Sequence, residues 1–161
     1  MTASTEQNGP NAAEVFRSLE DEIRSAVGVR LFTVLAWLPE RRVLRRVHSS
    51  HPGQYPVGGE KTVEVSSGWL EQCIDRQLPY LGADRAAVRE VFTDHRTIDA
   101  LGCGAVINTP VVGSGHTLGL LNVLHAERSY DQAAVQRVSA LTYQAVPALR
   151  ACVTHYDRTS N

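Results

Sequence analysis

The strongest constraint on the fold is a pair of apolar segments, residues 104–112 and 116–125, that only three residues separate. Both segments are rich in the aliphatic and β-branched side chains that are typical of strands. The residues between them, Gly113, Ser114 and Gly115, tolerate the positive φ angles that tight hairpin turns require. We therefore predict an antiparallel hairpin at the centre of a sheet, around which the rest of the chain has to pack.

Further strands and a set of helices flank this hairpin in the sequence. Residues 30–38 are densely apolar, and a turn at Pro39 leads into residues 42–50, where valines alternate with arginines. Residues 51–59 hold two prolines and three glycines, which favours a loop, and a short strand is predicted over 61–65. Helical spacing of apolar residues predicts a helix over 11–27 and a long helix from 131 to about 155, with a kink near Pro147. Between them, we predict a short helix that begins after Ser66 and Ser67 and ends before Pro79, and two more short helices over 84–92 and 95–101.

This order of elements predicts an α+β fold, in which an antiparallel sheet carries the N- and C-terminal helices on one face. Only residues 51–102 are left to cover the other face, so we expect a ligand cavity between them and the sheet. With 161 residues, 43% of them hydrophobic, the chain has the size of one domain. We expect a disordered lead over 1–11, the folded domain over 12–156 and a frayed tail over 157–161.

Composition excludes several classes of protein. The 16 lysines and arginines are balanced by 17 acidic residues, without the basic excess that nucleic-acid binding requires. No apolar run reaches the roughly 20 residues that span a bilayer, and the polar N-terminus does not resemble a signal peptide. Three widely spaced cysteines form neither a disulfide framework nor a CxxC metal motif. We therefore expect a soluble, cytoplasmic protein with no nucleic-acid or membrane partner, no metal and no cofactor.

The central hairpin resembles a known family. Its first strand ends in Asn-Thr-Pro-Val, and its second contains Leu-Gly-Leu-Leu-Asn-Val-Leu from Leu118 to Leu124. This pattern is similar to the final hairpin of GAF domains, which reads x-Pro-Val, a turn and then Gly-x-Leu-x-Leu, and the element order extends the resemblance over residues 15–153. The resemblance implies a sheet with terminal helices on one face, often a dimer interface, and a small-molecule pocket on the other. It also implies a stand-alone domain, since a GAF-like fold uses nearly all 161 residues.

The motifs of several GAF activities do not occur in the sequence. Bilin-binding members attach the chromophore to a cysteine beside a histidine, and neither Cys73 nor Cys103 has a histidine next to it. The cyclic-nucleotide signature Asn-Lys-x-x-x-Phe-x-x-x-Asp-Glu does not occur, and Cys103 alone stands where the free methionine sulfoxide reductases have paired cysteines. Small stand-alone GAF-like proteins, among them hydroxylaminobenzoate lyases, are similar in size and in the hairpin. A cofactor-independent lyase that releases ammonia is therefore an alternative.

The polar loop and the short helices supply the first candidate site residues. Tyr55 in the loop can stack on a ligand or pack as a lid, and the Ser49 hydroxyl can hold an anionic group. Asp94 is favoured as the N-cap of the helix that follows it, with ligand contact as the alternative. Histidine side chains exchange protons readily near neutral pH, so His95 can act as a general acid or base, or bind a carboxylate, if it faces the cavity.

Further candidates lie on the strands and on the first short helix. Asn108 and Asn122 stand in apolar strands, so each amide needs an internal partner or a ligand, and the internal partner is favoured. Strand alternation places Asn122 and His125 on opposite faces, so only one of them can face the cavity. Cys103, between two glycines, can approach a ligand or fill the core, and Trp69 is either a cavity residue or a core residue.

These residues predict a GAF-like domain that binds a small aromatic or carboxylated metabolite. The ligand-binding candidates are Ser49, Tyr55, Trp69, Asp94, His95, Cys103 and Asn108. In the lyase alternative, His95 or His125 is the catalytic residue that protonates the leaving group, and Tyr55 orients the ring. We expect a homodimer through the terminal helices.

Overall fold

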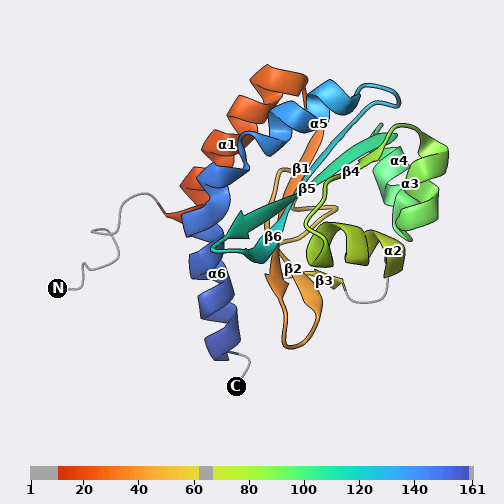
Figure 1. Ribbon diagram of the computed structural model, residues 1–161. Coiled ribbons are helices and arrows are strands. Elements are labelled where there is room, and N and C mark those ends of the chain that lie inside the picture. Colours follow the sequence, from red (N-terminus) through yellow and green to blue (C-terminus); the bar gives the residue numbers. More distant parts are fainter. Residues whose placement is uncertain (1–10, 62–66, 160–161) are drawn as a thin grey trace.

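The computed structural model of the chain describes residues 11–61 and 67–159, which form a sheet with helices on both faces (Figure 1). The six strands of these residues are antiparallel to their neighbours and lie in the order β3-β2-β1-β6-β5-β4. The strands are β1 (Leu31–Leu38), β2 (Val43–Ser49), β3 (Glu60–Lys61), β4 (Tyr80–Gly82), β5 (Ala105–Gly113) and β6 (His116–His125). The helices are α1 (Ala12–Val27), α2 (Ser67–Leu70) with a π-helical turn after it (Glu71–Asp75), α3 (Arg85–Val91), α4 (His95–Ala100), α5 (Gln132–Ser139), a 3-10 turn (Thr142–Ala145) and α6 (Val146–Thr159).

The predicted hairpin, β5 and β6, lies beside β1 in the middle of the sheet. Ser114 and Gly115 adopt φ angles of 53° and 79° in its turn, as the sequence predicts. β1 is buried along its whole length, because a strand lies on each side of it and side chains cover both of its faces. Alternation along β6 sends Leu121 to one face and Leu120 to the other. The sheet therefore separates two hydrophobic cores.

The helices from the two ends of the chain cover one face, as predicted. α1, α5 and α6 pack there, and Phe16, Val138 and Leu149 bury their side chains against the sheet. α1 begins with a capping box, in which the Asn11 side chain accepts a hydrogen bond from the Glu14 amide at 2.9 Å and the Glu14 carboxylate accepts one from the Asn11 amide at 3.1 Å. This layer supports the sheet from its helical face.

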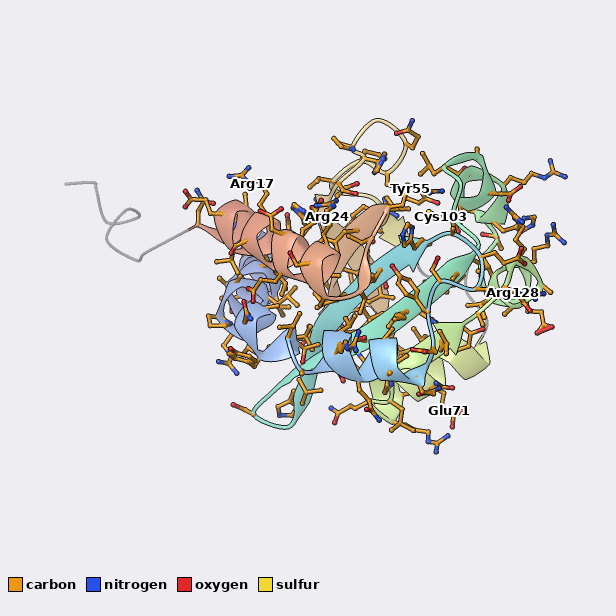
Figure 2. The ribbon with its side chains drawn as sticks, turned by 90° about the horizontal axis from the view of Figure 1, so that it is seen from above. Arg17, Arg24, Tyr55, Glu71, Cys103 and Arg128 are labelled. Atoms are coloured by element: carbon orange, nitrogen blue, oxygen red, sulfur yellow. The ribbon has the colours of Figure 1, made fainter. Side chains whose placement is uncertain are left out.

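Loop 51–59 and the short helices cover the other face, also as predicted. They contribute Tyr55, Trp69, Ile74, Val88, Phe92 and Ile98 to the second core. Seen from above, α1 with the outward-pointing Arg17 lies on one side of the sheet, and Tyr55 and Cys103 lie on the other (Figure 2). We therefore expect the candidate site to lie between this layer and the sheet.

The C-terminal segment differs from the single kinked helix that we predicted. It forms two helices, α5 and α6, which the 3-10 turn separates. Pro147 causes no kink, because it stands in the first turn of α6, where a missing N–H breaks no helical hydrogen bond. α6 also continues to Thr159, three residues into the segment 157–161 that we expected to be a frayed tail.

An edge strand and the predicted strand over 61–65 also differ from the expected secondary structure. β4 was not predicted, and its three residues add an edge strand next to β5. Of the strand predicted over 61–65, only Lys61 lies in the described part of the chain, and residues 1–10 of the predicted lead also lie outside it. No helix that the described residues form is long and apolar enough to cross a membrane.

Candidate functional site

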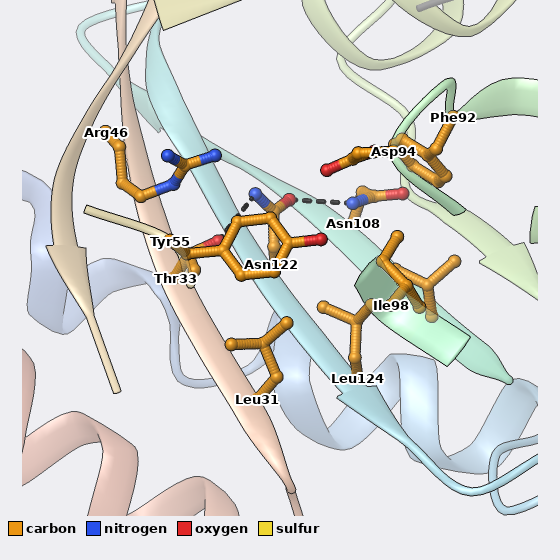
Figure 3. Close-up of a pocket in the computed structure, with 11 residues that line it drawn as sticks. Leu31, Thr33, Arg46, Tyr55, Phe92, Asp94, Ile98, Asn108, Asn122 and Leu124 are labelled. Atoms are coloured by element: carbon orange, nitrogen blue, oxygen red, sulfur yellow. Dashed lines mark hydrogen bonds between the residues drawn. The ribbon is translucent and has the colours of Figure 1, made fainter. Parts of the chain in front are cut away.

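A small cavity lies between the sheet and the layer of short helices (Figure 3). Its volume is about 30 Å³, which accommodates one or two water molecules. Apolar and polar side chains line it together: Leu31, Thr33, Arg46, Tyr55, Phe92, Asp94, Ile98, Val106, Asn108, Asn122 and Leu124. The cavity is in the predicted place, but a metabolite needs more room than this volume offers.

A chain of buried hydrogen bonds forms the floor of the cavity. The Trp69 indole N–H donates to the Asn108 side-chain oxygen at 3.0 Å, and the Asn108 amide nitrogen donates to the Asn122 oxygen at 2.7 Å. The Asn122 nitrogen then donates to the Thr33 hydroxyl at 3.1 Å. Asn122 lies opposite both Asn108 and Thr33 in the strand register, so three adjacent strands hold these groups in line. The internal partners predicted for both asparagines are present, and Asn122 is the residue that faces the cavity.

Arg46 and Tyr55 form one wall of the cavity, and both are almost fully buried. Arg46 is 7% exposed and Tyr55 is 6% exposed. The Arg46 guanidinium lies 4.9 Å from the centre of the Tyr55 ring and donates to the Pro56 carbonyl at 3.2 Å. The Arg46 Nε and the Tyr55 hydroxyl have no hydrogen-bond partner among the described residues. Two buried polar atoms thus stand next to a cavity with their hydrogen bonds unmade.

Electrostatics in the cavity follow from burial and from three neighbouring groups. Burial raises the pKa of the Tyr55 hydroxyl, and the nearby Asp94 carboxylate raises it further, so the phenol stays protonated and can donate. The Asp94 charge acts on this hydroxyl without the geometry of a hydrogen bond between them. Burial lowers the pKa of Arg46, while Tyr55 and Asp94 oppose this effect, so the guanidinium keeps its charge.

Asp94 does not cap the helix that follows it, which corrects the role we favoured from the sequence. It occupies the N-cap position of α4, but its side chain accepts no hydrogen bond from the helix amides. Asp84 and Asp131 do cap their helices, and both have the extended backbone that a capping side chain requires. Asp94 has φ −88° and ψ 24° instead. Its carboxylate points into the cavity from the side opposite Arg46 (Figure 3).

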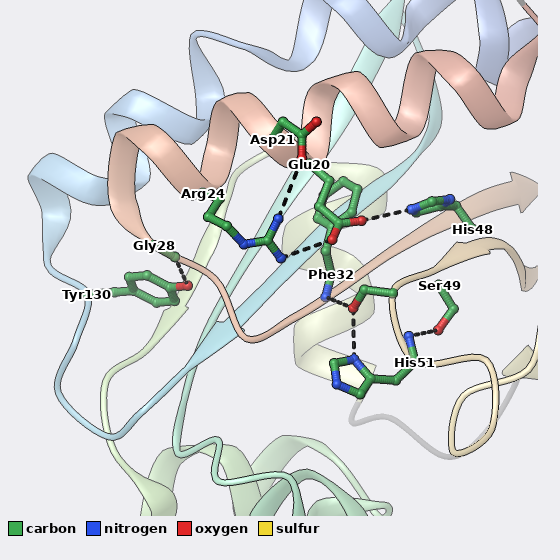
Figure 4. A network of polar contacts seen from close by, with 10 residues as sticks. Glu20, Asp21, Arg24, Gly28, Phe32, His48, Ser49, His51 and Tyr130 are labelled. Atoms are coloured by element: carbon green, nitrogen blue, oxygen red, sulfur yellow. Dashed lines mark hydrogen bonds and ion pairs between the residues drawn. The ribbon is translucent and has the colours of Figure 1, made fainter.

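The other site residues predicted from the sequence lie in separate parts of the molecule. Tyr55, Asp94 and Asn108 line the cavity together, and Trp69 lies behind them as the donor to Asn108. His95 and Cys103 line a different cleft of about 270 Å³, which also contains Arg85, Arg89, Arg96 and Asp99 from α3 and α4. Ser49 accepts a hydrogen bond from the His51 amide at 3.0 Å, near α1 (Figure 4). Neither His95 nor Ser49 is a cavity residue.

A polar contact near Ser49 joins α1 to β2 (Figure 4). The Glu20 carboxylate lies 3.2 Å from His48 Nε2 and accepts a hydrogen bond from Arg24 at 3.0 Å. The His48 ring packs between Phe16 and Phe32, with centroid distances of 5.7 and 5.6 Å. This contact anchors α1 to the sheet, on the side of the sheet that the cavity does not use.

His125 lies on the helical side of the sheet. Its ring packs near Tyr130 at a centroid distance of 6.1 Å, and its buried Nδ1 has no hydrogen-bond partner among the described residues. Burial lowers the pKa of His125, and the charge of Arg30 lowers it further. His125 is therefore held neutral and cannot reach the cavity from this face.

Replacing His125 with glutamine should make the protein less sensitive to mild acid. Because the folded state lowers the pKa of His125, the unfolded state binds its proton more tightly, and stability falls as the pH drops through about 6.5. Urea unfolding at about pH 7.5 and about pH 5 should show a smaller loss of stability for His125→Gln than for the wild type. An equal loss in both proteins would contradict this role. The other histidines are present in both proteins and cancel in the comparison.

The three cysteines are expected to be unreactive in the folded protein. Burial raises the pKa of Cys73 to about 12 and that of Cys103 to about 11, and it also raises the pKa of the half-buried Cys152. In native protein at neutral pH, DTNB should react slowly and first at Cys152. After unfolding, all three thiols should react at once. Rapid native labelling of Cys103, which is 1% exposed, would contradict its buried position.

Arg46 is a cavity residue that was not among the residues predicted from the sequence. Arg45 and Arg46 are adjacent on β2, so strand alternation sends their side chains to opposite faces of the sheet. Arg45 is half-buried on the helical face, where its guanidinium lies 4.2 Å from the centre of the Tyr156 ring of α6 and pairs with Glu60 at 3.0 Å. The alternation of valines and arginines over residues 42–50 therefore contained the signal, although it does not by itself indicate which arginine faces the cavity.

No family model matches the chain, and no curated protein matches it. The solved GAF domain of a two-component sensor histidine kinase from Bacillus halodurans is similar in structure, with a TM-score of 0.69 and 12% identity over 88% of this chain and 95% of that one. The GAF domain/HD domain protein from Geobacter sulfurreducens has a TM-score of 0.68 and 14% identity, over 89% of this chain and 92% of that one. A red/green cyanobacteriochrome in its red light-absorbing state has a TM-score of 0.64 and 16% identity, over 89% of this chain and 95% of that one. The fold of this chain is GAF-like, which confirms the resemblance predicted from the hairpin.

Proposed function

We propose that this chain is a GAF-like module that binds a small aromatic or carboxylated metabolite in the cavity between the sheet and the short helices. The observation that carries the proposal is the pair of unmade hydrogen bonds at Arg46 Nε and the Tyr55 hydroxyl. Leaving a buried donor unpaired costs about 1–3 kcal/mol, so a ligand acceptor placed there gains that interaction. Solved structures of similar fold include the domain of a sensor kinase and a light-absorbing protein, which supports a sensing role.

Binding requires the cavity to open, and Tyr55 is the group that we expect to move. Its ring rests on Arg46, and its hydroxyl has no hydrogen bond to a described residue that would break. Loop 51–59 carries it; the part around Tyr55 consists of turns, whereas Gly58 and Gly59 are hydrogen-bonded to the backbone of Arg46. The floor, by contrast, is fixed by hydrogen bonds across three strands and should stay in place.

The lyase alternative has less support than binding. It needs a proton donor beside the reacting group, and its candidates were His95 and His125. His95 lines the cleft between α3 and α4, and His125 lies on the helical side of the sheet. Ammonium release from 4-hydroxylaminobenzoate by the wild-type protein, lost in His95→Ala, would nevertheless restore the enzyme hypothesis over the binding one.

A thermal-shift screen of small carboxylates, amino acids and aromatic acids tests the proposed function. Hits should raise the melting temperature of the wild type and of Arg45→Gln equally, because Arg45 lies outside the cavity. Arg46→Gln should abolish the shift, and Tyr55→Phe, which removes only the hydroxyl, should reduce it. Hits that stabilise Arg46→Gln as strongly as the wild type would place binding elsewhere. A screen without any hit would contradict the proposed function.

We also propose a homodimer through the terminal helices, as well as a cytoplasmic location, in keeping with the sequence predictions. Tyr143, on the turn between α5 and α6, is 69% exposed and is the apolar group that a second copy would cover. Light scattering at micromolar concentration should give twice the mass of one chain. The mass of a single chain would contradict the dimer.

A further inference from the structure

We propose that the cleft between α3 and α4 binds a small phosphorylated molecule, whose phosphate monoester contacts Arg89 of α3 and Arg96 of α4. The cleft has a volume of about 270 Å³, close to the roughly 300 Å³ at which the usual range of ligand pockets begins. Figure 1 shows α3 and α4 together at one end of the molecule, away from α6. Among the described residues, none lines both this cleft and the cavity of Arg46 and Tyr55, so the inference does not rest on the proposed function.

Positive charges predominate in the lining of the cleft. Three guanidinium groups line it, those of Arg85, Arg89 and Arg96, and among the described residues Asp99 supplies the one lining carboxylate. The His95 ring lines the same space. A concave surface that is lined mainly by one sign of charge attracts small ligands of the opposite sign. The cleft therefore favours an anion.

Arg85 pairs with the carboxylates of this region. Its Nε donates to Asp99 at 2.6 Å, its Nη1 donates to Glu127 at 2.9 Å, and its backbone amide donates to the other Glu127 oxygen at 3.0 Å. Gly104 leaves room for these contacts, because a β-carbon there would lie 2.9 Å from the Glu127 side chain and 3.0 Å from that of Arg85. Arg85 thus connects α3 and α4 to the segment after β6, in a group of three charged side chains with a net charge of −1.

Arg89 and Arg96 keep their charges available for a ligand. Neither guanidinium has a hydrogen bond or an ion pair with another described residue. Their two positive charges exceed the net charge of −1 around Arg85. Arg30 adds a positive charge nearby, where it donates to the backbone carbonyl next to Cys103 at 2.7 Å. Burial raises the pKa of Cys103 and the charge of Arg30 partly offsets this effect, so the positive potential of Arg30 reaches the lining of the cleft.

Two unpaired guanidinium groups in one cleft match a phosphate monoester. Such a group carries a charge of about −1.5 to −2 at pH 7 and three acceptor oxygens, so it can accept hydrogen bonds from both arginines at once. A single carboxylate has one charge and two oxygens, which one guanidinium already satisfies. The buried side chains of Val88 and Cys103 form the apolar part of the lining. We therefore expect the phosphate to lie toward the arginines and a compact organic group to contact this apolar part.

Isothermal titration tests the site with inorganic phosphate and then with two monoesters, glycerol 3-phosphate and phenyl phosphate, in about 0.15 M NaCl. Each phosphate should bind with one equivalent, whereas glycerol and phenol should not bind. Arg89→Gln and Arg96→Gln should each weaken phosphate binding roughly 10- to 100-fold, because each removes hydrogen bonds to a charged group. Both arginines are exposed, so the two variants should keep the melting temperature of the wild type.

Three further variants provide controls. Arg17→Gln removes an outward-pointing arginine of α1, on the other side of the sheet (Figure 2), and should bind phosphate as the wild type does. Arg46→Gln should also bind phosphate normally, which separates this site from the proposed function. Asp99→Asn should bind phosphate more tightly, because it removes a negative charge from the cleft and releases Arg85 Nε. A variant that merely damaged the fold would not bind more tightly.

Three results would overturn the inference. The first is the absence of binding by all three phosphates at millimolar concentration. The second is binding that neither Arg89→Gln nor Arg96→Gln weakens, which would indicate an adventitious ion only. The third is capture of the protein by phosphatidic acid vesicles, lost in Arg89→Gln, without binding of the soluble monoesters, since the phosphate would then belong to a lipid headgroup.

Discussion

Replacing Gly119 with alanine should lower the free energy of unfolding by about 3–5 kcal/mol, the largest effect that we expect from a single methyl group. Gly119 lies on β6, opposite Ala36 of β1 and Val111 of β5. A β-carbon at this position would collide with the backbone carbonyl of Leu35 and would lie 3.1 Å from the Leu149 side chain. The Leu35 carbonyl cannot yield, because strands fix β1 on both sides and side chains bury both of its faces.

Two other glycines provide controls for this collision. Gly53→Ala should leave stability unchanged, because no atom lies within 4 Å of the added carbon. Gly115→Ala has the same open space but a φ of 79°, so it should cost only about 1 kcal/mol of backbone strain. Urea unfolding of the three variants separates crowding from strain. A Gly119→Ala protein within about 1 kcal/mol of the wild type would contradict the close approach of the strands.

Replacing Asn108 with leucine should lower the free energy of unfolding by about 2–5 kcal/mol, because it removes a hydrogen-bond partner from each of two buried groups. The Trp69 indole N–H would lose its acceptor and the Asn122 oxygen would lose its donor. Thr33→Val, which keeps the shape and removes only the last acceptor of the chain, should cost about 1 kcal/mol. Equilibrium unfolding of both variants measures the difference.

A double variant checks that the cost comes from unpaired groups. Asn108→Leu with Asn122→Leu removes both partners of the 2.7 Å hydrogen bond, so the double variant should be more stable than the sum of the two single effects implies. Strict additivity would show that the two amides are not coupled. In that case, the floor of the cavity would not act as one hydrogen-bonded unit.

Much of the fold could be predicted from local patterns in the sequence. The turn residues Ser114 and Gly115 define the central hairpin, because few residues adopt positive φ angles without strain. The uniform apolarity of residues 31–38 indicates a strand that is covered on both faces, which β1 is. Helical spacing placed α1 and the two C-terminal helices on one layer. These features depend on residues close together in the chain.

The candidate site could be predicted only in part, because it depends on contacts between distant segments. Asp94 stands at a helix start in the sequence, yet its side chain makes no capping hydrogen bond and the residue lines the cavity instead. The bulge between Val34 and Leu35 shifts the pairing of β1 with β2, so the register beside Arg46 is irregular. Pro147 suggested a kink, whereas the break falls at the 3-10 turn before it. Local patterns contain none of this information.

The most direct test of ligand binding in the cavity is a ¹H–¹⁵N NMR titration with the compound that gives the largest stabilisation in the thermal-shift screen. We predict that the Arg46 Nε–H signal and the side-chain amide signals of Asn108 and Asn122 shift together and saturate at one equivalent, because these groups face the ligand. The backbone signals of α1 and the signals of Arg89 and Arg96, in the separate cleft, should stay in place. Shifts confined to α1 or to that cleft, with the Arg46 Nε–H signal unchanged, would contradict the proposed site.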